Sequence, residues 1–396
     1  MRVGISGTFL DKPMTGSGQY VRNLLRELSG IDDVEMTVFC PSGTAFDEAR
    51  AMLQDAAHVK APSLVHVKTP FQGNLGKVWF EQFGLPQSCR AEKVDLLHVP
   101  YFGSPLRPPC PTVVTVHDLI SMVLPRYRSS IHIWAYVALV SAAARKANVV
   151  IADSQYTKGD IVRLLRIPEQ RILAVPLACE KRFHPISDVE SVEAVRRKYG
   201  LPDSFVLYVG GLDWRKNVPT LIQAFAAAES NWQLAIAGEP YGGRGTLFPN
   251  LLEVARRCGI ERRVKFLGLV AEEDKPALYS VAGLFVFPSV YEGFGLTPLE
   301  AMACGAPVLC SNATSLPEVV GDAAVVFDPN DEKGLTAALD SLFSDDARRE
   351  ELRLRGLEQA RKFSWRRTAE ETLAVYEMAL SSNGGGGAGG SARSAA

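Results

Sequence analysis

Hydrophobic positions along the chain repeat with two different periods, which predicts an alternation of strands and helices. Residues 2–6 form a short apolar run of the kind found in buried strands, and residues 19–29 have the spacing of an amphipathic helix. The apolar face of that helix consists of Tyr20, Val21, Leu24, Leu25 and Leu28. Further strands of the same series are predicted at 36–40, 95–100, 112–118 and 149–154.

A second series of apolar runs begins after residue 200, again with helical segments between the runs. Strands that are apolar throughout and alternate with helices form parallel sheets covered on both faces. We therefore predict two Rossmann-like, doubly wound α/β domains that face each other across a central cleft. The strands of the second domain are predicted at 205–211, 233–239, 264–268, 284–289, 307–311 and 324–329.

The chain length also favours two domains, because 396 residues exceed what one ordinary core accommodates. The pattern is interrupted between Cys179 and Val189, so the first domain is predicted at 1–185 and the second at 186–365. A helix is predicted at 366–381, and it could cross back to the first domain. Residues 382–396 are rich in Gly, Ser and Ala, which predicts a flexible tail.

Charge is distributed unevenly between the two predicted halves. Residues 1–185 carry 21 Lys and Arg against 16 Asp and Glu, whereas the rest of the chain carries 22 against 28. The net charge of −1 argues against a nucleic-acid binder. The basic first half suits an acidic acceptor or an anionic membrane face, and an accidental asymmetry is the alternative.

The cysteines and the N-terminus indicate a cytoplasmic protein. The seven cysteines are scattered and form no CxxC pair, which is typical of reduced thiols, and no Cys/His cluster has zinc spacing. The N-terminus begins with a strand and has no signal-peptide pattern. The apolar run at 134–144 is too short to span a bilayer. We expect a cytoplasmic location, with peripheral membrane contact through the first half as one possibility.

Polar and glycine-rich segments follow several predicted strands. Ligands of doubly wound sheets bind at the carboxyl ends of the strands, so these loops are expected to line one cleft. The segments lie at 15–20, 116–119, 210–217, 237–243 and 291–297.

The segment 290–308 places two glutamates, Glu292 and Glu300, on either side of a glycine-rich turn. Thr297 and Glu300 have the spacing of a capping box, with Pro298 as the first helical residue, so Glu300 could serve only as a cap. A glycine-rich loop before a helix N-terminus also favours close approach by an anionic ligand. Two carboxylates beside such a loop suit a ligand with phosphates and hydroxyls, such as a nucleotide sugar.

Three other groups are candidates for the same ligand. Arg215 and Lys216 follow a strand and a glycine pair, where cations could bind a diphosphate, although a solvated pair is the alternative. Gly16 and Gly18 precede a helix and suit either a phosphate-approach loop or a plain turn. His117 lies at the end of a predicted strand, where it could either contact the ligand or be a buried structural histidine. The chain contains no D-x-D motif, so a metal-bridged diphosphate site is not expected.

These residues carry a resemblance to glycosyltransferase family 4. Residues 288–308 resemble the E-x7-E signature of that family, with its continuation at Gly305, Pro307 and Val308. Weaker matches follow in the family's order along most of the chain. The resemblance implies the GT-B fold, in which the second of two Rossmann-like domains holds most of the donor. It departs from the family at Gly210-Gly211-Leu212, where many members have an arginine in place of the second glycine.

The resemblance also implies a role for each matching residue. Glu292 would contact the donor sugar, Glu300 the ribose, and Arg215 and Lys216 the diphosphate. His117 would touch the donor sugar. The remaining donor contacts would come from Gly16 and Gly18, from Gly211, from Leu269 beside the nucleobase, and from the backbone of Gly293, Phe294, Gly295 and Leu296.

The sequence thus predicts a retaining, metal-independent glycosyltransferase without a cofactor, whose co-substrate is a nucleotide-diphosphate sugar. Family members that resemble this chain at 210–217 and 116–119 transfer mannose, so the resemblance implies GDP-mannose as the first expected donor, with a glycan or lipid-linked acceptor. UDP-glucose and a deoxysugar donor stay open. The alternatives are an epimerase or phosphorylase on the same fold, and a non-catalytic nucleotide-sugar binding protein.

Overall fold

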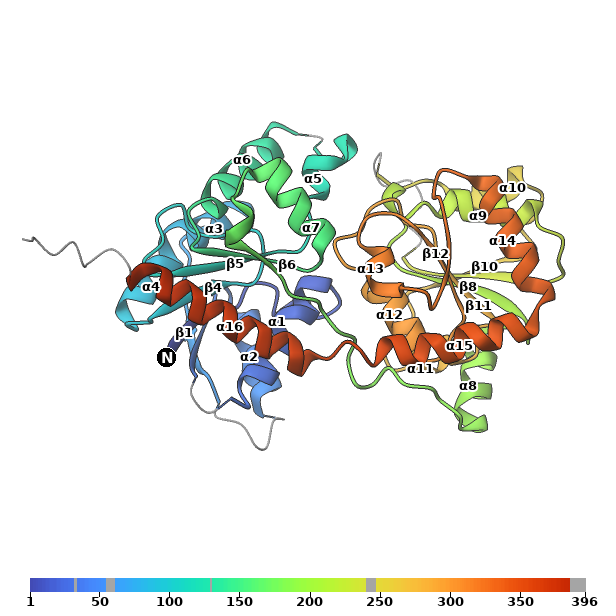
Figure 1. The fold of residues 1–396 in the computed structure, drawn as a ribbon, viewed down its shortest axis with the longest axis horizontal. Helices are drawn as coiled ribbons and strands as arrows, with labels where there is room; N and C mark the ends of the chain where they lie inside the picture. The colour runs from blue at the N-terminus through green and yellow to red at the C-terminus, as the bar shows by residue number, and fades with distance from the viewer. Residues whose placement is uncertain (32–33, 55–60, 129, 240–246, 385–396) are drawn as a thin grey trace, which may run out of the picture.

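The protein consists of two α/β domains, each built around a parallel sheet (Figure 1). The structure is a computed structural model and describes residues 1–31, 34–54, 61–128, 130–239 and 247–384. The first sheet has the order β3-β2-β1-β4-β5-β6-β7 and the second β10-β9-β8-β11-β12-β13. This confirms the predicted fold class of two doubly wound parallel sheets.

The first sheet contains every strand predicted for it, and two more at its edges. These are the edge strands β3 and β7, which have four and three residues and were not predicted. The strands are β1 (Arg2–Ser6), β2 (Glu35–Cys40), β3 (Ser63–His66), β4 (Leu96–Val99), β5 (Thr112–Val116), β6 (Val149–Ala152) and β7 (Ile172–Ala174).

Helices cover both faces of the first sheet. All five residues of the predicted apolar face of α1 are fully buried, which confirms that prediction. The α-helices are α1 (Gly16–Leu28), α2 (Gly43–Gln54), α3 (Gly73–Trp79), α4 (Leu85–Ala91), α5 (Ile120–Val123), α6 (Ile131–Ala144) and α7 (Gln155–Asp160). Short 3-10 helices lie at η2 (Pro125–Tyr127) and η4 (Glu169–Arg171), and α3 and α7 continue as π-helices at η1 (Phe80–Gly84) and η3 (Ile161–Leu165).

The second sheet contains the six strands predicted for it. They are β8 (Phe205–Val209), β9 (Gln233–Ala237), β10 (Val264–Gly268), β11 (Leu284–Phe287), β12 (Val308–Ser311) and β13 (Val325–Phe327). Its helices are α8 (Val189–Tyr199), η5 (Trp214–Lys216), α9 (Val218–Ala227), α10 (Leu251–Arg257), α11 (Lys275–Ser280), α12 (Leu296–Ala303), α13 (Leu316–Val320), α14 (Glu332–Ser344) and α15 (Asp346–Ala360).

The last helix, α16 (Trp365–Gly384), leaves the second domain and runs across the first, beside α1 (Figure 1). Its Thr368 hydroxyl donates to the carbonyl of Pro176 at 2.7 Å, and its Tyr376 hydroxyl lies 2.7 Å from His98 Nδ1. The helix extends three residues into the predicted tail, whose remainder, 385–396, lies outside the described residues. Among the helices of the described residues, none is both long and apolar enough to cross a membrane.

Candidate active site

A cavity of about 660 Å³ lies between the two domains and is lined by both. It collects the loops that follow the carboxyl ends of the strands, as the parallel topology predicts. Every predicted site residue except Gly18 lies in its wall. These residues are Gly16, His117, Gly211, Arg215, Lys216, Leu269, Glu292, Gly293, Phe294, Gly295, Leu296 and Glu300.

Gly18 has a structural role in the loop that carries Gly16. Its N–H donates to the Thr15 hydroxyl at 3.1 Å, which caps α1. A Cβ atom at this position would lie 2.0 Å from the carbonyl oxygen of Lys12, so a side chain does not fit. Gly16 has open space where its Cβ would stand. On the α1 loop, the room for a ligand is therefore at Gly16 and not at Gly18.

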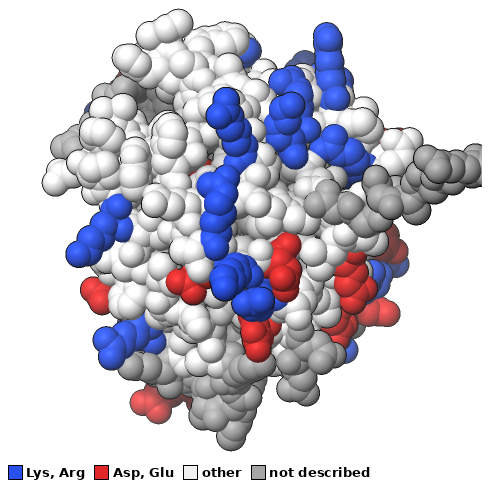
Figure 2. Space-filling view, turned by 90° about the vertical axis from the view of Figure 1, so that its left-hand side faces the viewer, with Lys and Arg blue, Asp and Glu red and all other residues white. Residues whose placement is uncertain are grey.

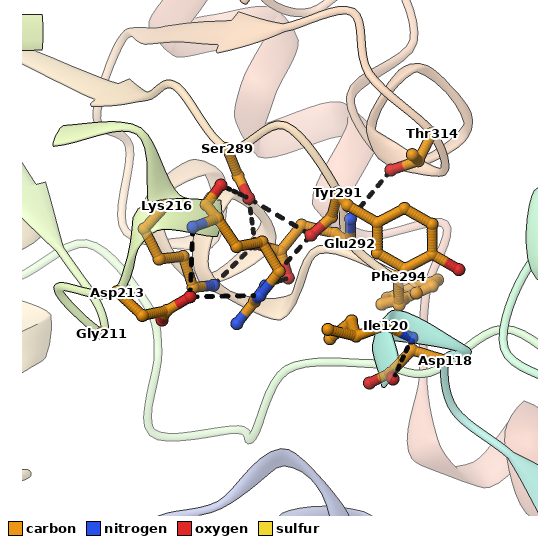
Figure 3. A network of polar contacts seen from close by, with 12 residues as sticks. Asp118, Ile120, Gly211, Asp213, Lys216, Ser289, Tyr291, Glu292, Phe294 and Thr314 are labelled. Carbon is orange, nitrogen blue, oxygen red and sulfur yellow. Dashed lines mark hydrogen bonds and ion pairs between the residues drawn. The ribbon is translucent and has the colours of Figure 1, made fainter. Parts of the chain in front are cut away.

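Glu292 is the centre of a buried ionic network (Figure 3). Its two carboxylate oxygens lie 2.6 Å from Lys216 Nζ and 2.8 Å from Arg215 Nη1. The hydroxyl of Ser289 donates to Glu292 Oε1 at 2.6 Å. Burial by itself would raise the pKa of Glu292, but the two cations and these hydrogen bonds lower it to about 2. Glu292 is thus ionised, and its charge is balanced by the cations predicted to bind a diphosphate.

The loop before η5 holds Arg215 in place. Asp213 Oδ1 lies 3.6 Å from Arg215 Nε, and Arg215 Nη1 donates to the carbonyl of Tyr291 at 3.1 Å. Arg215 Nε is buried and has no hydrogen-bond partner among the residues that the structure describes. Burial opposes the charge of Arg215, but Glu292 and Asp213 outweigh it and raise its pKa. The guanidinium therefore keeps its charge inside the cavity.

The predicted capping box at Thr297 and Glu300 is wrong. Helix α12 begins two residues earlier than predicted, at Leu296, and its N-cap is Gly295, whose φ of 129° is accessible to glycine. No side chain caps this helix. Glu300 instead accepts a hydrogen bond from the Tyr279 hydroxyl at 3.2 Å, and burial raises its pKa to about 7. The helix N-terminus is thus left open toward the cavity, and Glu300 is available to a ligand.

His117 is engaged through both of its ring nitrogens. Nδ1 lies 2.8 Å from Asp153 Oδ2, and Nε2 lies 3.1 Å from the carbonyl oxygen of Pro100. Burial lowers the pKa of His117, but the charge and hydrogen bond of Asp153 outweigh this and raise it. Neither nitrogen is left over for the donor sugar that the resemblance implies.

Gly293 joins the E-x7-E loop to the first domain. Its carbonyl accepts hydrogen bonds from the hydroxyls of Ser154, at 2.8 Å, and Thr157, at 3.0 Å. A Cβ atom on Gly293 would lie 1.8 Å from the carbonyl oxygen of His117, so the two chain segments approach as closely as glycine allows. The backbone of the predicted donor loop is thus held by the opposite domain.

Three acidic residues of the cavity wall or of the ionic network around Glu292 were not predicted as site residues. Asp118 and Asp153 line the cavity just beyond the ends of β5 and β6, and Asp213 supports Arg215. The rule that located His117 at a strand end also applies to Asp153, so this residue could have been found. Asp213 gives no such signal, because its role depends on where the loop folds. In the described ranges, no cluster of three or more His, Cys, Asp or Glu has the geometry of a metal site.

Two family models match the chain, one in each domain. The model described as "Glycosyltransferase Family 4" matches residues 14–179, and that described as "Glycosyl transferases group 1" matches residues 191–362. The O-antigen chain mannosyltransferase B of Escherichia coli is 33% identical over 374 residues, which are 92% of this chain and 97% of that protein. The chain belongs to glycosyltransferase family 4. It is therefore a glycosyltransferase, as its sequence predicted.

Other similar proteins support the same assignment. The serotype-specific mannosyltransferase WbdA of Escherichia coli is 33% identical over 69% of this chain, which matches 34% of that longer protein. Among solved structures, sucrose-phosphate synthase from Thermosynechococcus elongatus has a TM-score of 0.76 at 21% identity, covering 96% of this chain and 100% of that one. Anabaena HepE, in complex with UDP-glucose, has a TM-score of 0.74 at 20% identity, covering 94% and 99%. The fold is GT-B.

Proposed function

We propose that this glycosyltransferase moves mannose from GDP-mannose to a glycan or lipid-linked acceptor, with retention of configuration and without a metal ion. One observation carries the proposal. Arg215 and Lys216 converge in a cavity beside the open N-terminus of α12, with Glu292 between them. Cations and a free helix N-terminus suit a diphosphate leaving group, and a carboxylate suits sugar hydroxyls.

The reaction would need little from the protein besides charge stabilisation. The acceptor oxygen forms a bond to the anomeric carbon on the face from which the diphosphate leaves, while the bond to the phosphate oxygen breaks. The proton of the acceptor hydroxyl passes to the leaving phosphate, so no protein base is required. Arg215 and Lys216 would stabilise the negative charge that builds up on this phosphate.

Mannose is the preferred sugar because two similar proteins are named mannosyltransferases. UDP-glucose stays a candidate donor because a structural neighbour is in complex with it, although that likeness concerns the fold. The family assignment favours transfer over the epimerase and phosphorylase alternatives. Against a non-catalytic binding protein stands the Arg215–Lys216–Glu292 arrangement, which a purely binding site would not require.

Thermal-shift measurements against a panel of nucleotide sugars test the donor. A ligand that binds the native state raises stability by RT ln(1 + [L]/Kd), so about 2.7 kcal/mol at a hundredfold excess over Kd. GDP-mannose is expected to give the largest shift, and NMR of the product with a mannosylated acceptor is expected to show a retained anomeric configuration. A larger shift with another nucleotide sugar would contradict the donor, and an inverted product would contradict the mechanism.

We also propose that the first domain contacts an anionic or membrane-borne acceptor at a cytoplasmic membrane face. Figure 2 views the molecule from the first-domain end, where Lys and Arg side chains gather in the upper and middle parts, and acidic side chains lie in the middle and lower parts together with further basic ones. Large apolar side chains are also exposed on this domain. They include Phe71, Leu75, Phe83, Ile131 and Trp134, with exposed fractions of 50%, 71%, 64%, 76% and 49%.

A further inference from the structure

The cavity wall contributed by the first domain contains a carboxylate of which only one oxygen has a hydrogen-bond partner among the described residues. Asp153 follows β6 and is 3% exposed. Its Oδ2 atom accepts the hydrogen bond from His117 Nδ1, whereas its Oδ1 atom is buried and has no partner among the described residues. A buried carboxylate oxygen without a hydrogen bond is costly, because its hydration has been lost without compensation.

His117 cannot supply the missing hydrogen bond. Both groups that its ring nitrogens face, the Asp153 carboxylate and the Pro100 carbonyl, are hydrogen-bond acceptors. The ring therefore satisfies both contacts only as an imidazolium with an N–H at each nitrogen. Its second proton is directed at Pro100, and Tyr20 packs edge-on against the ring, with the two centroids 4.9 Å apart. The histidine is held in place and stays a fixed positive charge.

Asp153 borders the cavity, so a ligand bound there is the candidate partner for its buried Oδ1 atom. Asp153 lines the cavity together with His117 and Asp118, on the wall that faces Arg215 and Glu292. The tyrosine hydroxyl of Tyr20 is occupied elsewhere, since it lies 3.1 Å from the Thr115 hydroxyl. A ligand with hydroxyl groups can donate a hydrogen bond to a carboxylate, and a phosphate ester cannot do so without a proton of its own.

We propose that Asp153 is a sugar-binding residue, whose Oδ1 atom accepts a hydrogen bond from a hydroxyl of a neutral hexose in the cavity while Oδ2 holds the imidazolium of His117. The inference rests on the proposed function and deepens it. This wall carries the carboxylates of Asp118 and Asp153 and the imidazolium of His117. It is therefore suited to an uncharged sugar ring, even though the domain around it is basic. The hydroxyl belongs either to the donor hexose or to the acceptor sugar.

The first experiment compares wild type with Asp153→Asn, which keeps the size of the side chain and one oxygen for His117. Calorimetry with GDP and with GDP-mannose isolates the contribution of the donor sugar, and the KM of a methyl mannoside acceptor reports on the acceptor. We expect GDP affinity to be unchanged and one of the two sugar readouts to weaken by roughly tenfold or more, because charge-assisted hydrogen bonds are the stronger ones. Which readout weakens identifies the source of the hydroxyl. If neither weakens, the proposal is overturned.

A second experiment separates ligand binding from positioning of His117. A series of monodeoxy mannose analogues is measured with wild type and with Asp153→Asn. If Asp153 binds one hydroxyl, the analogue that lacks it loses affinity with wild type and loses no more with the variant. If Asp153 acts only through His117, every analogue weakens by the same factor in the variant, and the proposal fails.

Two controls complete the design. Asp95→Asn, in the same domain and bonded to the backbone N–H of Arg2 at 2.7 Å, should leave all readouts unchanged. Should Asp153→Asn not fold, Asp153→Glu keeps the charge but displaces the oxygen, and it should lose the same discrimination between analogues. A wild type that binds GDP-mannose no better than GDP and transfers to no acceptor would overturn the proposed function and this inference with it. Equal results for wild type and variant would overturn this inference alone.

Discussion

The carboxylate of Glu318, in the second domain, accepts a hydrogen bond from the backbone N–H of Tyr156, in the first domain, at 2.7 Å. Its other oxygen accepts from the N–H of Gln155 at 2.8 Å. The first turn of α7, which also holds the carbonyl of Gly293, is therefore bound by α13 of the opposite domain. This contact links the second domain to the segment of the first domain that holds the E-x7-E loop.

Glu318→Gln is expected to weaken donor binding although Glu318 is not part of the cavity wall. Glutamine has one acceptor oxygen, so one of the two N–H groups would lose its partner. Because Glu318 is exposed, we expect a loss of about 1 kcal/mol, or roughly fivefold in the KM of the donor. Small-angle scattering should show a more open protein. Glu358→Gln, an exposed glutamate on α15, is the matched control, and equal kinetics in both variants would contradict the link.

Glu300 gives a pH-dependent test. Its pKa is about 7 in the folded protein, against 4.5 for an ordinary glutamate, because burial disfavours the charged form. Between these values the folded state holds a proton that the unfolded state has lost, so the stability from this group is present below about pH 4.5 and falls as the pH rises to 7. In Glu300→Gln this fall should be absent. The variant should thus gain stability over wild type, by up to about 3 kcal/mol at pH 7 and above, as measured by urea unfolding.

The same variant tests whether Glu300 binds the ribose. The capping role is excluded by the structure, since Gly295 is the N-cap of α12. If the carboxylate accepts hydrogen bonds from ribose, donor affinity in Glu300→Gln should fall by roughly tenfold for each 1.4 kcal/mol lost. Calorimetric titration with the donor measures this. Unchanged affinity would mean that Glu300 does not bind the ribose and only accepts the hydrogen bond from Tyr279.

Turnover is expected to be independent of divalent metal ions. Arg215 and Lys216 would supply the positive charge that a metal supplies elsewhere, and the chain has no D-x-D motif. Initial rates should be the same with and without excess EDTA. Inactivation by EDTA that magnesium or manganese reverses would show that the two cations are not sufficient.

Attachment to anionic membranes is expected to depend on salt. The attraction of the basic first domain should fade as salt is added, because the Debye length is about 8 Å at physiological ionic strength and shorter at higher salt. Flotation with phosphatidylglycerol liposomes should recover the protein at low salt and less of it at high salt. Neutral liposomes serve as the control, and absence of binding at low salt would argue against a membrane role.

The sequence by itself determined the fold class, most strands of each sheet and the set of loops that line the cavity. These features depend on local periodicity and on the rule that loops at the carboxyl ends of parallel strands meet, and both can be read residue by residue. The edge strand β3 was not predicted because none of its four residues is fully buried, so its apolar pattern is weak, and the edge strand β7 was not predicted although its three residues are apolar. The capping box predicted from Thr297 and Glu300 was wrong because its spacing is a local signal. Gly295 had the backbone freedom to begin the helix earlier.

Only the tertiary structure decided how the charged groups are paired. The order of residues does not show that Lys216 and Arg215 both bind Glu292. It also does not show that one oxygen of Asp153 accepts a hydrogen bond from His117 while the other has no partner among the described residues. These partners are brought together within each domain, because the loops that carry them follow neighbouring strands of one sheet, β8 and β11 in the second domain and β5 and β6 in the first. Since the strength of an ionic contact depends on distance and burial, the state of each of these groups was settled only by the order of the strands in each sheet and the fold of the loops that follow them.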